Sequence, residues 1–275
     1  MPEMPEVETV RRDLHRRVIG RRIDAVHATG ARTVRRTSPT IVRDRLIGRT
    51  ITGTSRRGKY LIVELDDDQW MLVHLRMSGQ LILCDGDAPL ANHTHVRLRF
   101  DDERELRFVD PRTFGEVVVV DPANLPIEAP DVAALGPEPL EIERRDFDRI
   151  IRGRRRMLKA MLLDQHVVAG IGNIYADEIC HAARLRYDRA GDSLSTRQVG
   201  VLHNAMQSIL SAAIDARGST LRDAQYVDLG GLAGGYQDRH AVYDRAGLPC
   251  KRCGRPIVRV VGAGRSTYLC PRCQR

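Results

Sequence analysis

Four cysteines near the end of the chain constrain its fold more than any other feature. They form two C-x-x-C pairs, CKRC and CPRC, sixteen residues apart, and comprise Cys250, Cys253, Cys270 and Cys273. Paired knuckles of this kind are typical of a zinc ribbon, in which four thiolates hold one Zn²⁺. Disulfides are the alternative, and the lack of a secretory signal pattern disfavours them. We therefore predict one structural Zn²⁺ per chain. Cys84 and Cys180 lack such spacing, so we expect them to be core residues.

The positive charge of the chain is concentrated in the same segment. The formal net charge is +8 over 275 residues, and seven basic but no acidic residues lie from Cys250 to Arg275. A basic tail is often a disordered arm that binds nucleic acid, but the cysteine pairs favour an ordered finger. The runs SRRGKY, DPRTFG and RGRRRMLKA are also basic. Each alone is typical of solvated surface, whereas together with the finger they predict nucleic acid as the partner.

The first residues, MPEMPEVETV, predict a capped amphipathic helix with an unusual start. Its apolar positions follow helical spacing at Val7, Val10, Leu14 and Val18. Removal of Met1 would expose a secondary amine on Pro2, and an α-amino group with a pKa near ~8 is partly unprotonated at neutral pH. Such an amine can act as a nucleophile, with Glu3 and Glu6, one turn apart, as proton-transfer groups. An ordinary acidic helix cap is the alternative interpretation.

The middle of the chain changes from a strand pattern to a helix pattern. Eight short β-like runs follow the first helix: RIDAVHA, TITGTSRR, YLIVEL, WMLVHL, QLILC, HVRLRF, ELRFV and EVVVV. They predict a β-sandwich or barrel as far as about residue 120. Five prolines then indicate a linker, after which a helical rhythm continues to Gly218. The segment AGIGNIYADEI predicts a glycine-rich turn before a helix, suited either to a phosphate or to a plain connection.

Several motifs together resemble the formamidopyrimidine-DNA glycosylases, bifunctional DNA glycosylases and AP lyases. They are MPEMPEVETVRR, RRGKYL, MSGQL, DPRTFG, LGPEPL, GIGNIYADEI, VYDRAGLPC and GRSTYLCPRCQ, and they run nearly end to end. The resemblance implies an α+β multidomain protein. We expect an N-terminal β-sandwich domain with a leading helix at 1–121, a linker at 122–141, a helix-two-turn-helix domain at 142–239 and a zinc finger at 240–275.

The resemblance also implies a catalytic set for excision of oxidised purines from double-stranded DNA. Pro2 is the expected nucleophile at the sugar C1′ atom, Glu3 the proton donor, and Glu6 a residue that positions the terminus. Lys59 is expected to assist β-elimination and to contact phosphate. Arg265 is expected to grip phosphates and to promote δ-elimination.

Further positions match DNA contacts of the family. Met77, Arg112 and Phe114 match the trio that fills the hole left by a flipped nucleotide and faces the orphaned cytosine. Other matching DNA contacts are His93, Arg155, Lys159 and Asn173. Residues Ser219 to Gln237 are expected to cap the lesion. The chain departs from the family pattern at Arg76, where glycine is more usual, and at Thr113, which replaces a frequent basic residue; Arg76 raises the question of how the Met77 loop enters the duplex.

Two alternatives remain open from the sequence. An endonuclease VIII-like enzyme would keep Pro2 and Glu3 but remove oxidised pyrimidines, and a non-catalytic damaged-DNA-binding protein would need no terminal amine. The trio and the long loop oppose the first, and the retained catalytic set opposes the second. We expect a monomeric, cytoplasmic, DNA-associated protein without membrane contact, because no long apolar run is present.

Overall fold

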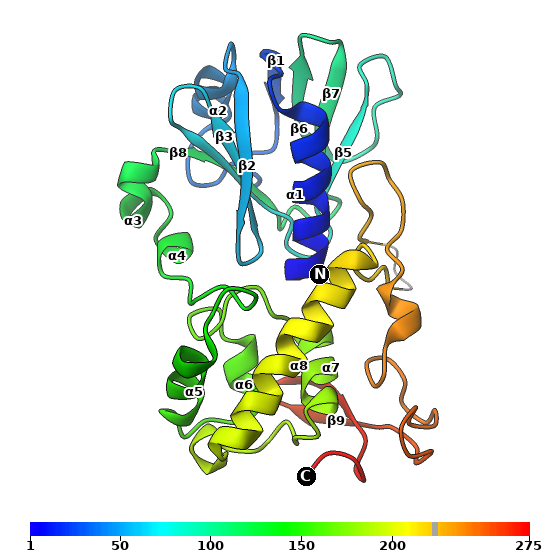
Figure 1. Ribbon diagram of the computed structural model, residues 1–275. Helices are drawn as coiled ribbons and strands as arrows, with labels where there is room; N and C mark the ends of the chain where they lie inside the picture. Colours follow the sequence, from blue (N-terminus) through cyan, green and yellow to red (C-terminus); the bar gives the residue numbers. More distant parts are fainter. Residues whose placement is uncertain (222–224) are drawn as a thin grey trace. The chain divides into compact units, whose positions relative to one another are not determined.

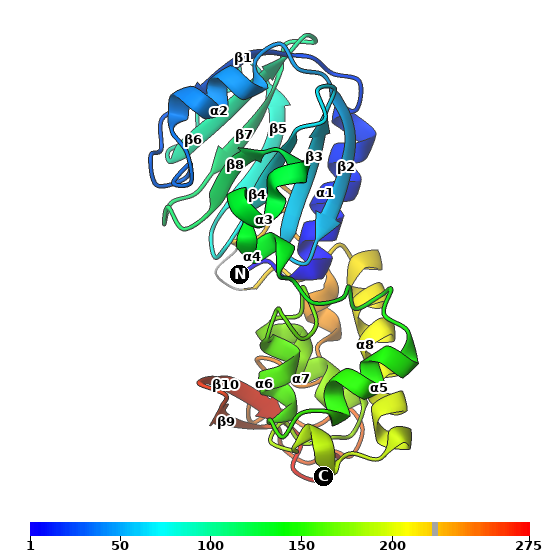
Figure 2. The same ribbon diagram turned by 90° about the vertical axis from the view of Figure 1, so that its left-hand side faces the viewer.

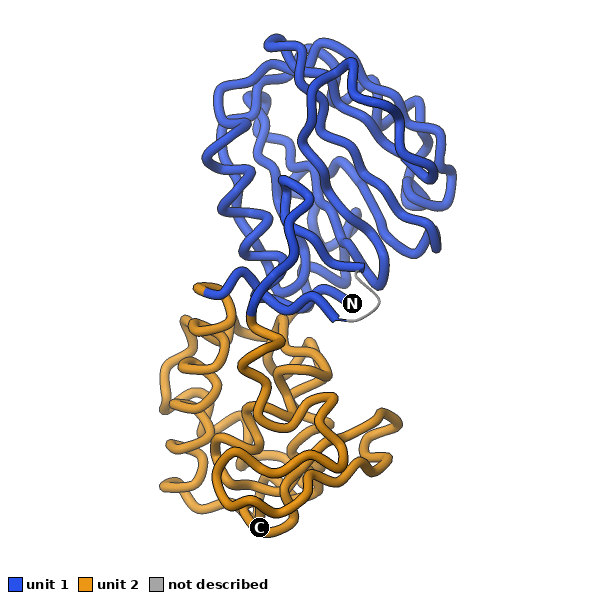
Figure 3. The backbone as a smooth tube through the Cα atoms, turned by 90° about the vertical axis from the view of Figure 1, so that its right-hand side faces the viewer, with its two compact units in different colours: residues 1–134, 216–235 blue, residues 135–215, 236–275 orange. Residues whose placement is uncertain are grey.

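The computed structural model describes residues 1–221 and 225–275, which form two compact units. Unit 1 combines residues 1–134 with residues 216–235, and unit 2 combines residues 135–215 with residues 236–275 (Figure 3). The two units do not test the domain boundaries expected from the sequence, because those boundaries concern segments that fold on their own. The boundaries therefore stay predictions. Within the described ranges no helix has the length and apolar character needed to cross a membrane.

Unit 1 is built on two antiparallel four-stranded sheets (Figures 1 and 2). All eight runs predicted as strands are strands. One sheet has the order β1 (Ile23–Ala28), β6 (Thr94–Phe100), β7 (Arg104–Val109), β5 (Gln80–Asp85). The other has the order β2 (Ile51–Arg57), β3 (Tyr60–Leu65), β4 (Trp70–His74), β8 (Glu116–Val120). Alternating apolar residues from both sheets form one core, as expected for a sandwich.

Two helices complete that core. The first helix, α1 (Met4–Val18), lies beside β2 and β3 and buries the predicted apolar positions Val7, Val10, Leu14 and Val18, each at most 1% exposed. The second, α2 (Pro39–Leu46), begins at Ser38, whose hydroxyl accepts the Ile41 N–H at 3.2 Å. A serine in this position satisfies a backbone donor that the first turn leaves without a partner. The leading helix predicted from periodicity is therefore confirmed.

The strand order brings two loops of unit 1 to the same edge. The β4–β5 loop, residues 75–79, and the β7–β8 loop, residues 110–115, are both crossings between the two sheets. His74, at the end of β4, pairs with Glu116 at the start of β8. Gln80, at the start of β5, pairs with Val109 at the end of β7. Both loops therefore begin and end on paired strands, so they are neighbours in space.

The proline-rich stretch after β8 contains three short helical segments. They are η1 (Pro122–Asn124), α3 (Leu125–Glu128) and α4 (Pro130–Ala133), and each has proline in its first turn. Proline is tolerated there because its missing N–H would have no helical partner. Asp131 of α4 accepts two hydrogen bonds from Arg36, at 2.6 and 2.8 Å, and one from the Tyr60 hydroxyl at 2.5 Å. These bonds attach the stretch to the sandwich.

Unit 2 is mainly helical and ends in a two-stranded hairpin. Its helices are α5 (Arg144–Arg152), α6 (Leu158–Leu163), α7 (Asn173–Ala182) and α8 (Thr196–Asp215), with short turns η2 (Gly191–Ser193) and η3 (Tyr236–Arg239). The hairpin consists of β9 (Val258–Gly262) and β10 (Arg265–Leu269). As predicted, α7 follows the GIGN turn, with Gly172 as its N-cap. Helix α7 packs against α6, α8 and β10 and is the centre of the unit.

Candidate functional site

The segment that directly follows the exposed Met1 is buried and held by one carboxylate. Pro2, Glu3 and Glu6 are all buried. One oxygen of Glu6 accepts the Glu3 N–H at 2.8 Å, and the other accepts the Ser219 N–H at 2.7 Å. Gly218 adopts φ +76°, and a Cβ atom there would lie 2.7 Å from the Glu6 Oε1 atom. The structure therefore brings the predicted catalytic residues of the terminus together and adds Gly218 and Ser219 to them.

A second contact attaches the same returning segment to α1. The Arg217 guanidinium donates to the carboxylates of Asp13 on α1, at 2.5 Å, and of Asp228, at 2.6 Å. The Tyr226 hydroxyl donates to the Arg217 carbonyl at 3.0 Å. Part of the predicted lesion-capping loop, residues 222–224, lies outside the described residues. Of the described remainder, residues 219–221 and 225–235 belong to unit 1, and Ser219 and Tyr226 donate hydrogen bonds to Glu6 on the helix that carries the terminus.

Lys59 lies in the turn between β2 and β3, directly after Gly58 at φ +56°. Its side chain is 6% exposed. Burial, and then the charges of Arg76 and Lys59, lower the pKa of His74 well below its usual value. The neutral His74 ring accepts the Arg76 N–H through Nδ1 at 2.9 Å. This bond fixes the backbone immediately before Met77.

Met77, Arg112 and Phe114 project from the two neighbouring loops of unit 1. Met77 is 39% exposed and Phe114 is 45% exposed, so both apolar side chains are accessible to a ligand. The Arg112 guanidinium lies 4.9 Å from the centre of the Phe114 ring, within cation–π range. His93 is also exposed and precedes β6. Four of the predicted DNA contacts therefore share unit 1 with Pro2 and Lys59.

The departures at Arg76 and Thr113 have a clear backbone consequence. Arg76 has φ +51° and Thr113 has φ +54°, and His93 nearby has φ +64°. Residues other than glycine rarely adopt this left-handed region, and a β-branched residue such as threonine does so least readily. The surrounding contacts must therefore hold these three residues in place.

In unit 2, Arg265 is exposed at the start of β10, and two other predicted residues support its hairpin. Lys159 has no exposed surface and forms an ion pair with Asp177 at 2.7 Å. Its ammonium also donates to the Ser266 carbonyl at 3.1 Å and to the Thr267 hydroxyl at 2.8 Å. The Asn173 amide donates to the same Ser266 carbonyl at 3.1 Å. DNA contacts by Lys159 and Asn173 stay predictions, whereas their hold on the strand that begins with Arg265 is direct.

Arg155 is exposed in the loop between α5 and α6. It belongs to unit 2, as do Lys159, Asn173 and Arg265. Its guanidinium is therefore available to a ligand at the surface of that unit.

The four predicted ligand cysteines form one cluster. Their Sγ atoms all lie within 4.8 Å of one another, with 4.0 Å between Cys250 and Cys273 and 3.4 Å between Cys253 and Cys270. A disulfide needs about 2.05 Å between its sulfurs. Tetrahedral Zn²⁺ with Zn–S bonds of about 2.3 Å places them about 3.8 Å apart. The cluster therefore fits a closed structural zinc site made of four thiolates.

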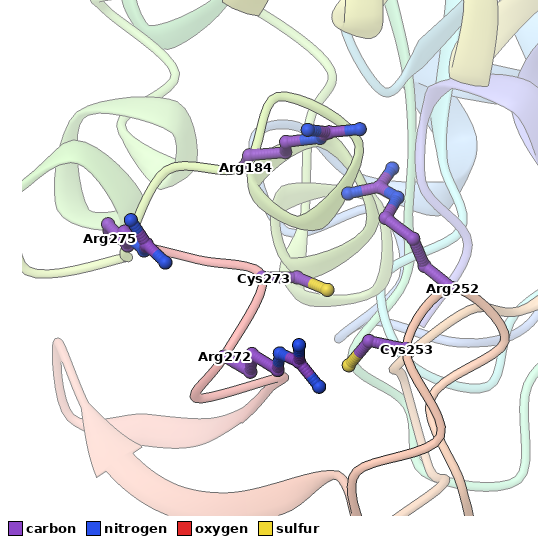
Figure 4. Close-up of a pocket in the computed structure, with 6 residues that line it drawn as sticks. All are labelled: Arg184, Arg252, Cys253, Arg272, Cys273 and Arg275. Carbon is purple, nitrogen blue, oxygen red and sulfur yellow. The ribbon is translucent and has the colours of Figure 1, made fainter.

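Charged and polar groups around this cluster match its chemistry. A hollow next to Cys253 and Cys273 is lined by the arginines Arg184, Arg252, Arg272 and Arg275 (Figure 4). Zn²⁺ with four thiolates carries a net charge of −2, which these guanidiniums offset. The Nε2 atom of His181 on α7 lies 3.6 Å from the Cys250 sulfur. Glu178, one turn earlier, accepts the N–H groups of Ala241, Val242 and Tyr243 at 2.8–2.9 Å and so fixes the segment that leads into the finger.

Comparison with known families covers almost the whole chain. Residues 1–117 match the formamidopyrimidine-DNA glycosylase N-terminal domain, residues 135–225 match the H2TH domain of the same enzymes, and residues 247–275 match the zinc finger found in FPG and IleRS. The chain is 42% identical to the formamidopyrimidine-DNA glycosylase of Desulforamulus reducens, over all of this chain and 99% of the relative. It is also 42% identical to that of Herpetosiphon aurantiacus, over all of both chains. The chain belongs to the formamidopyrimidine-DNA glycosylase family.

Solved structures of this family have the same fold. The MutM (Fpg) protein of Thermus thermophilus is 40% identical and superposes with a TM-score of 0.89 over 99% of this chain and 98% of its own. Lactococcus lactis Fpg, in a complex with DNA that contains N7-benzyl-Fapy-dG, is 37% identical and superposes with a TM-score of 0.91 over all of both chains. The α+β fold and the structural zinc site predicted from the sequence are confirmed.

The structure also identifies supporting residues that the sequence analysis missed. Asp177 and Glu178 lie in the quoted NIYADEI motif, yet no spacing shows which backbone groups they bind. Arg217 and Ser219 lie more than two hundred residues from their partners on α1. The sequence shows these charged and polar residues, but it does not show which groups they bind.

We expect one Zn²⁺ per purified chain, lost in Cys253→Ala. Removing one of four thiolates opens the coordination sphere, and a finger with a four-residue apolar cluster has little else to stabilise it. Elemental analysis of reduced protein gives the stoichiometry. Cys84→Ala, outside the cluster, is the matched control and should keep its zinc. Zinc-free native protein, or equal zinc content in both variants, would contradict the assignment.

Proposed function

We propose that this protein removes oxidised purines from double-stranded DNA and then cuts the strand at the resulting abasic site. The observation that carries the proposal is the buried terminus, in which Glu6 joins the Glu3 and Ser219 N–H groups beside Pro2. A protein that only binds DNA has no use for so closely held a terminal amine. Membership of the glycosylase family, and the DNA complex of the Lactococcus lactis relative, support the same reaction.

The reaction would begin with Pro2 after removal of Met1. The unprotonated proline nitrogen attacks the sugar C1′ atom, the bond from C1′ to the base breaks, and the base departs with a proton from Glu3. The proline nitrogen then loses its proton, and the bond from C1′ to the ring oxygen breaks with protonation of that oxygen, which leaves an iminium (Schiff base) between Pro2 and C1′. Glu6 does not touch the reacting atoms in this scheme, and its role is to position the terminus.

The iminium would then permit strand cutting. It acidifies the C2′ proton, so β-elimination expels the 3′ phosphate, and δ-elimination expels the 5′ phosphate. We assign Lys59 to the first elimination and to phosphate contact, and Arg265 to phosphate binding and the second elimination. Lys59 is enclosed next to a tight turn, and Lys159 and Asn173 hold the strand that Arg265 begins. Neighbouring residues therefore hold the backbone that carries the Lys59 and Arg265 side chains.

The exposed trio supports a purine substrate paired with cytosine. We propose that Met77 and Phe114 replace the flipped nucleotide in the stack and that Arg112 donates to the acceptor edge of the orphaned cytosine. His93 and Arg155 would contact the phosphate backbone. We further propose that the protein acts as a monomer, associated with DNA in the cytoplasm. The structural zinc would stabilise the finger and take no part in the chemistry.

A chain extended before Pro2 should lose base excision. The proline nitrogen becomes an amide, which is not nucleophilic, so trapping by borohydride on an 8-oxoguanine duplex should fall by at least about 1,000-fold. The control is the same protein after proteolytic release of the extension, which regenerates the amine and should restore the adduct. An extended chain that traps DNA at the native rate would refute the mechanism.

Gly218→Ala should slow excision by about 10- to 100-fold, the range expected when a catalytic group is displaced by an ångström or so. Its new methyl group would meet Glu6 at 2.7 Å. Gly48→Ala is the matched control, because Gly48 also has positive φ, +77°, but has no neighbour within 4 Å of a Cβ atom and lies outside the proposed site. Both variants bear similar backbone strain. Single-turnover rates that fall equally in both would exclude a role through Glu6.

Arg112→Ala should reduce the preference for 8-oxoguanine opposite C over 8-oxoguanine opposite A. A good bidentate contact to a base discriminates by ~1–3 kcal/mol, so the ratio of single-turnover rates should fall about 5- to 150-fold. Arg99→Ala, at an exposed arginine of the same unit, should leave the ratio unchanged. Native protein that removes thymine glycol faster than 8-oxoguanine would instead indicate an endonuclease VIII-like activity.

A further inference from the structure

One buried carboxylate connects the two loops that carry the exposed trio. Asp110 has no exposed surface. Its Oδ1 atom accepts the Ser78 hydroxyl at 2.5 Å, and its Oδ2 atom accepts the Gly115 N–H at 2.6 Å. Ser78 directly follows Met77, and Gly115 directly follows Phe114. The two carboxylate oxygens therefore hold the backbone next to both apolar side chains.

The main chain of Asp110 makes further contacts with the same group of residues. Its N–H donates to the His93 carbonyl at 3.0 Å, and its carbonyl accepts the Thr113 N–H at 3.2 Å. The Arg112 N–H donates to Oδ1 at 3.2 Å. His93 and Thr113 are two of the residues with left-handed backbone, and such strain persists only where surrounding contacts enforce it. Asp110 supplies those contacts.

The packing beneath the two loops also connects them. A Cβ atom on Gly79 would lie 2.9 Å from the Phe108 Cζ atom, and a Cβ atom on Gly115 would lie 2.5 Å from it. Both loops therefore rest on the edge of one buried ring, two residues before Asp110. On the outer side, the Arg35 guanidinium donates to the carbonyls of Phe114 and Gly115 at 2.7 and 2.8 Å.

We infer that Asp110 is a positioning residue that couples the Met77 loop to the Arg112–Phe114 loop, so that the trio enters the duplex as one rigid unit. The inference rests on the role proposed above for the trio. The two oxygens of Asp110 serve three donors, two of them backbone N–H groups on different oxygens. An asparagine has one acceptor oxygen, so its NH₂ group must face one of those N–H groups. A carboxylate is therefore required, not merely a polar residue of that size.

Asp110→Asn tests the coupling. We expect the ratio of excision rates opposite C and opposite A to fall at least about fivefold, since a misplaced Arg112 loses most of a good bidentate base contact. A second readout is independent of catalysis: 2-aminopurine fluorescence next to a tetrahydrofuran abasic-site analogue in a duplex. Filling of the stack by Met77 and Phe114 changes this fluorescence, and the variant should lose at least half of the change at saturating protein.

Ser78→Ala provides a milder test if the asparagine variant does not fold. It removes only the link to the Met77 loop, because Gly115 and Arg112 keep their bonds to Asp110. The fluorescence change should again decrease. Ser55→Ala is the matched control, since it also deletes a serine–carboxylate bond of unit 1, from Ser55 to Glu64 at 2.7 Å, outside both loops. This control should behave as the native protein in both assays.

The outcomes separate the coupling from the proposed function. A folded Asp110→Asn variant with native opposite-base ratio and native fluorescence change overturns the inference. So does a fluorescence change in Ser78→Ala that equals the change in Ser55→Ala. Native protein that excises no lesion refutes the proposed function, while the abasic-analogue fluorescence still decides whether Asp110 couples the loops.

Discussion

The Glu6 carboxylate fixes the place where the chain begins, and the candidate chemistry depends on that position. A terminal residue normally has few restraints, because it has a neighbour on one side only. Here α1 is anchored in the sandwich core by Val7, Val10 and Leu14. Glu6 binds the Glu3 N–H directly before the helix and the Ser219 N–H of the returning segment. The packed core therefore holds the first residues as firmly as residues in the middle of a helix or strand are usually held.

The same design recurs at the other candidate sites. Exposed groups that would contact a ligand lie on backbone that buried polar residues hold in place. These buried residues are Asp110 beneath the Phe114 loop, Lys159 and Asp177 beneath the Arg265 strand, and Glu178 behind the finger. Each buried residue has at least two hydrogen-bond or ion-pair partners, which offset part of the cost of removing a charge from water. At each site, buried contacts thus hold the backbone that carries the exposed side chains.

The sequence predicted the elements and the chemistry of this chain better than it predicted the supporting contacts. Helix α1 and all eight sandwich strands follow from hydrophobic periodicity, and the zinc site follows from cysteine spacing, because both signals are local. Lys159 illustrates the limit. It matches a DNA-contacting position of the family, but the sequence does not show that its ammonium is enclosed with Asp177, eighteen residues away, and with Thr267 in the finger. Asp110 likewise stands in a quoted motif, but its bond to Ser78 depends on strand order.

Because residues 216–235 belong to unit 1, this unit can be completed only late in the synthesis of the chain. During translation, α1 and the strands emerge first, while Ser219, which gives Glu6 its second partner, emerges about two hundred residues later. At common elongation rates of about 5–20 residues per second, that delay lasts on the order of ten seconds or more. Throughout this interval Glu6 lacks its bond to the Ser219 N–H. In the mechanism proposed above, removal of Met1 during this interval would free the Pro2 amine before Ser219 reaches Glu6.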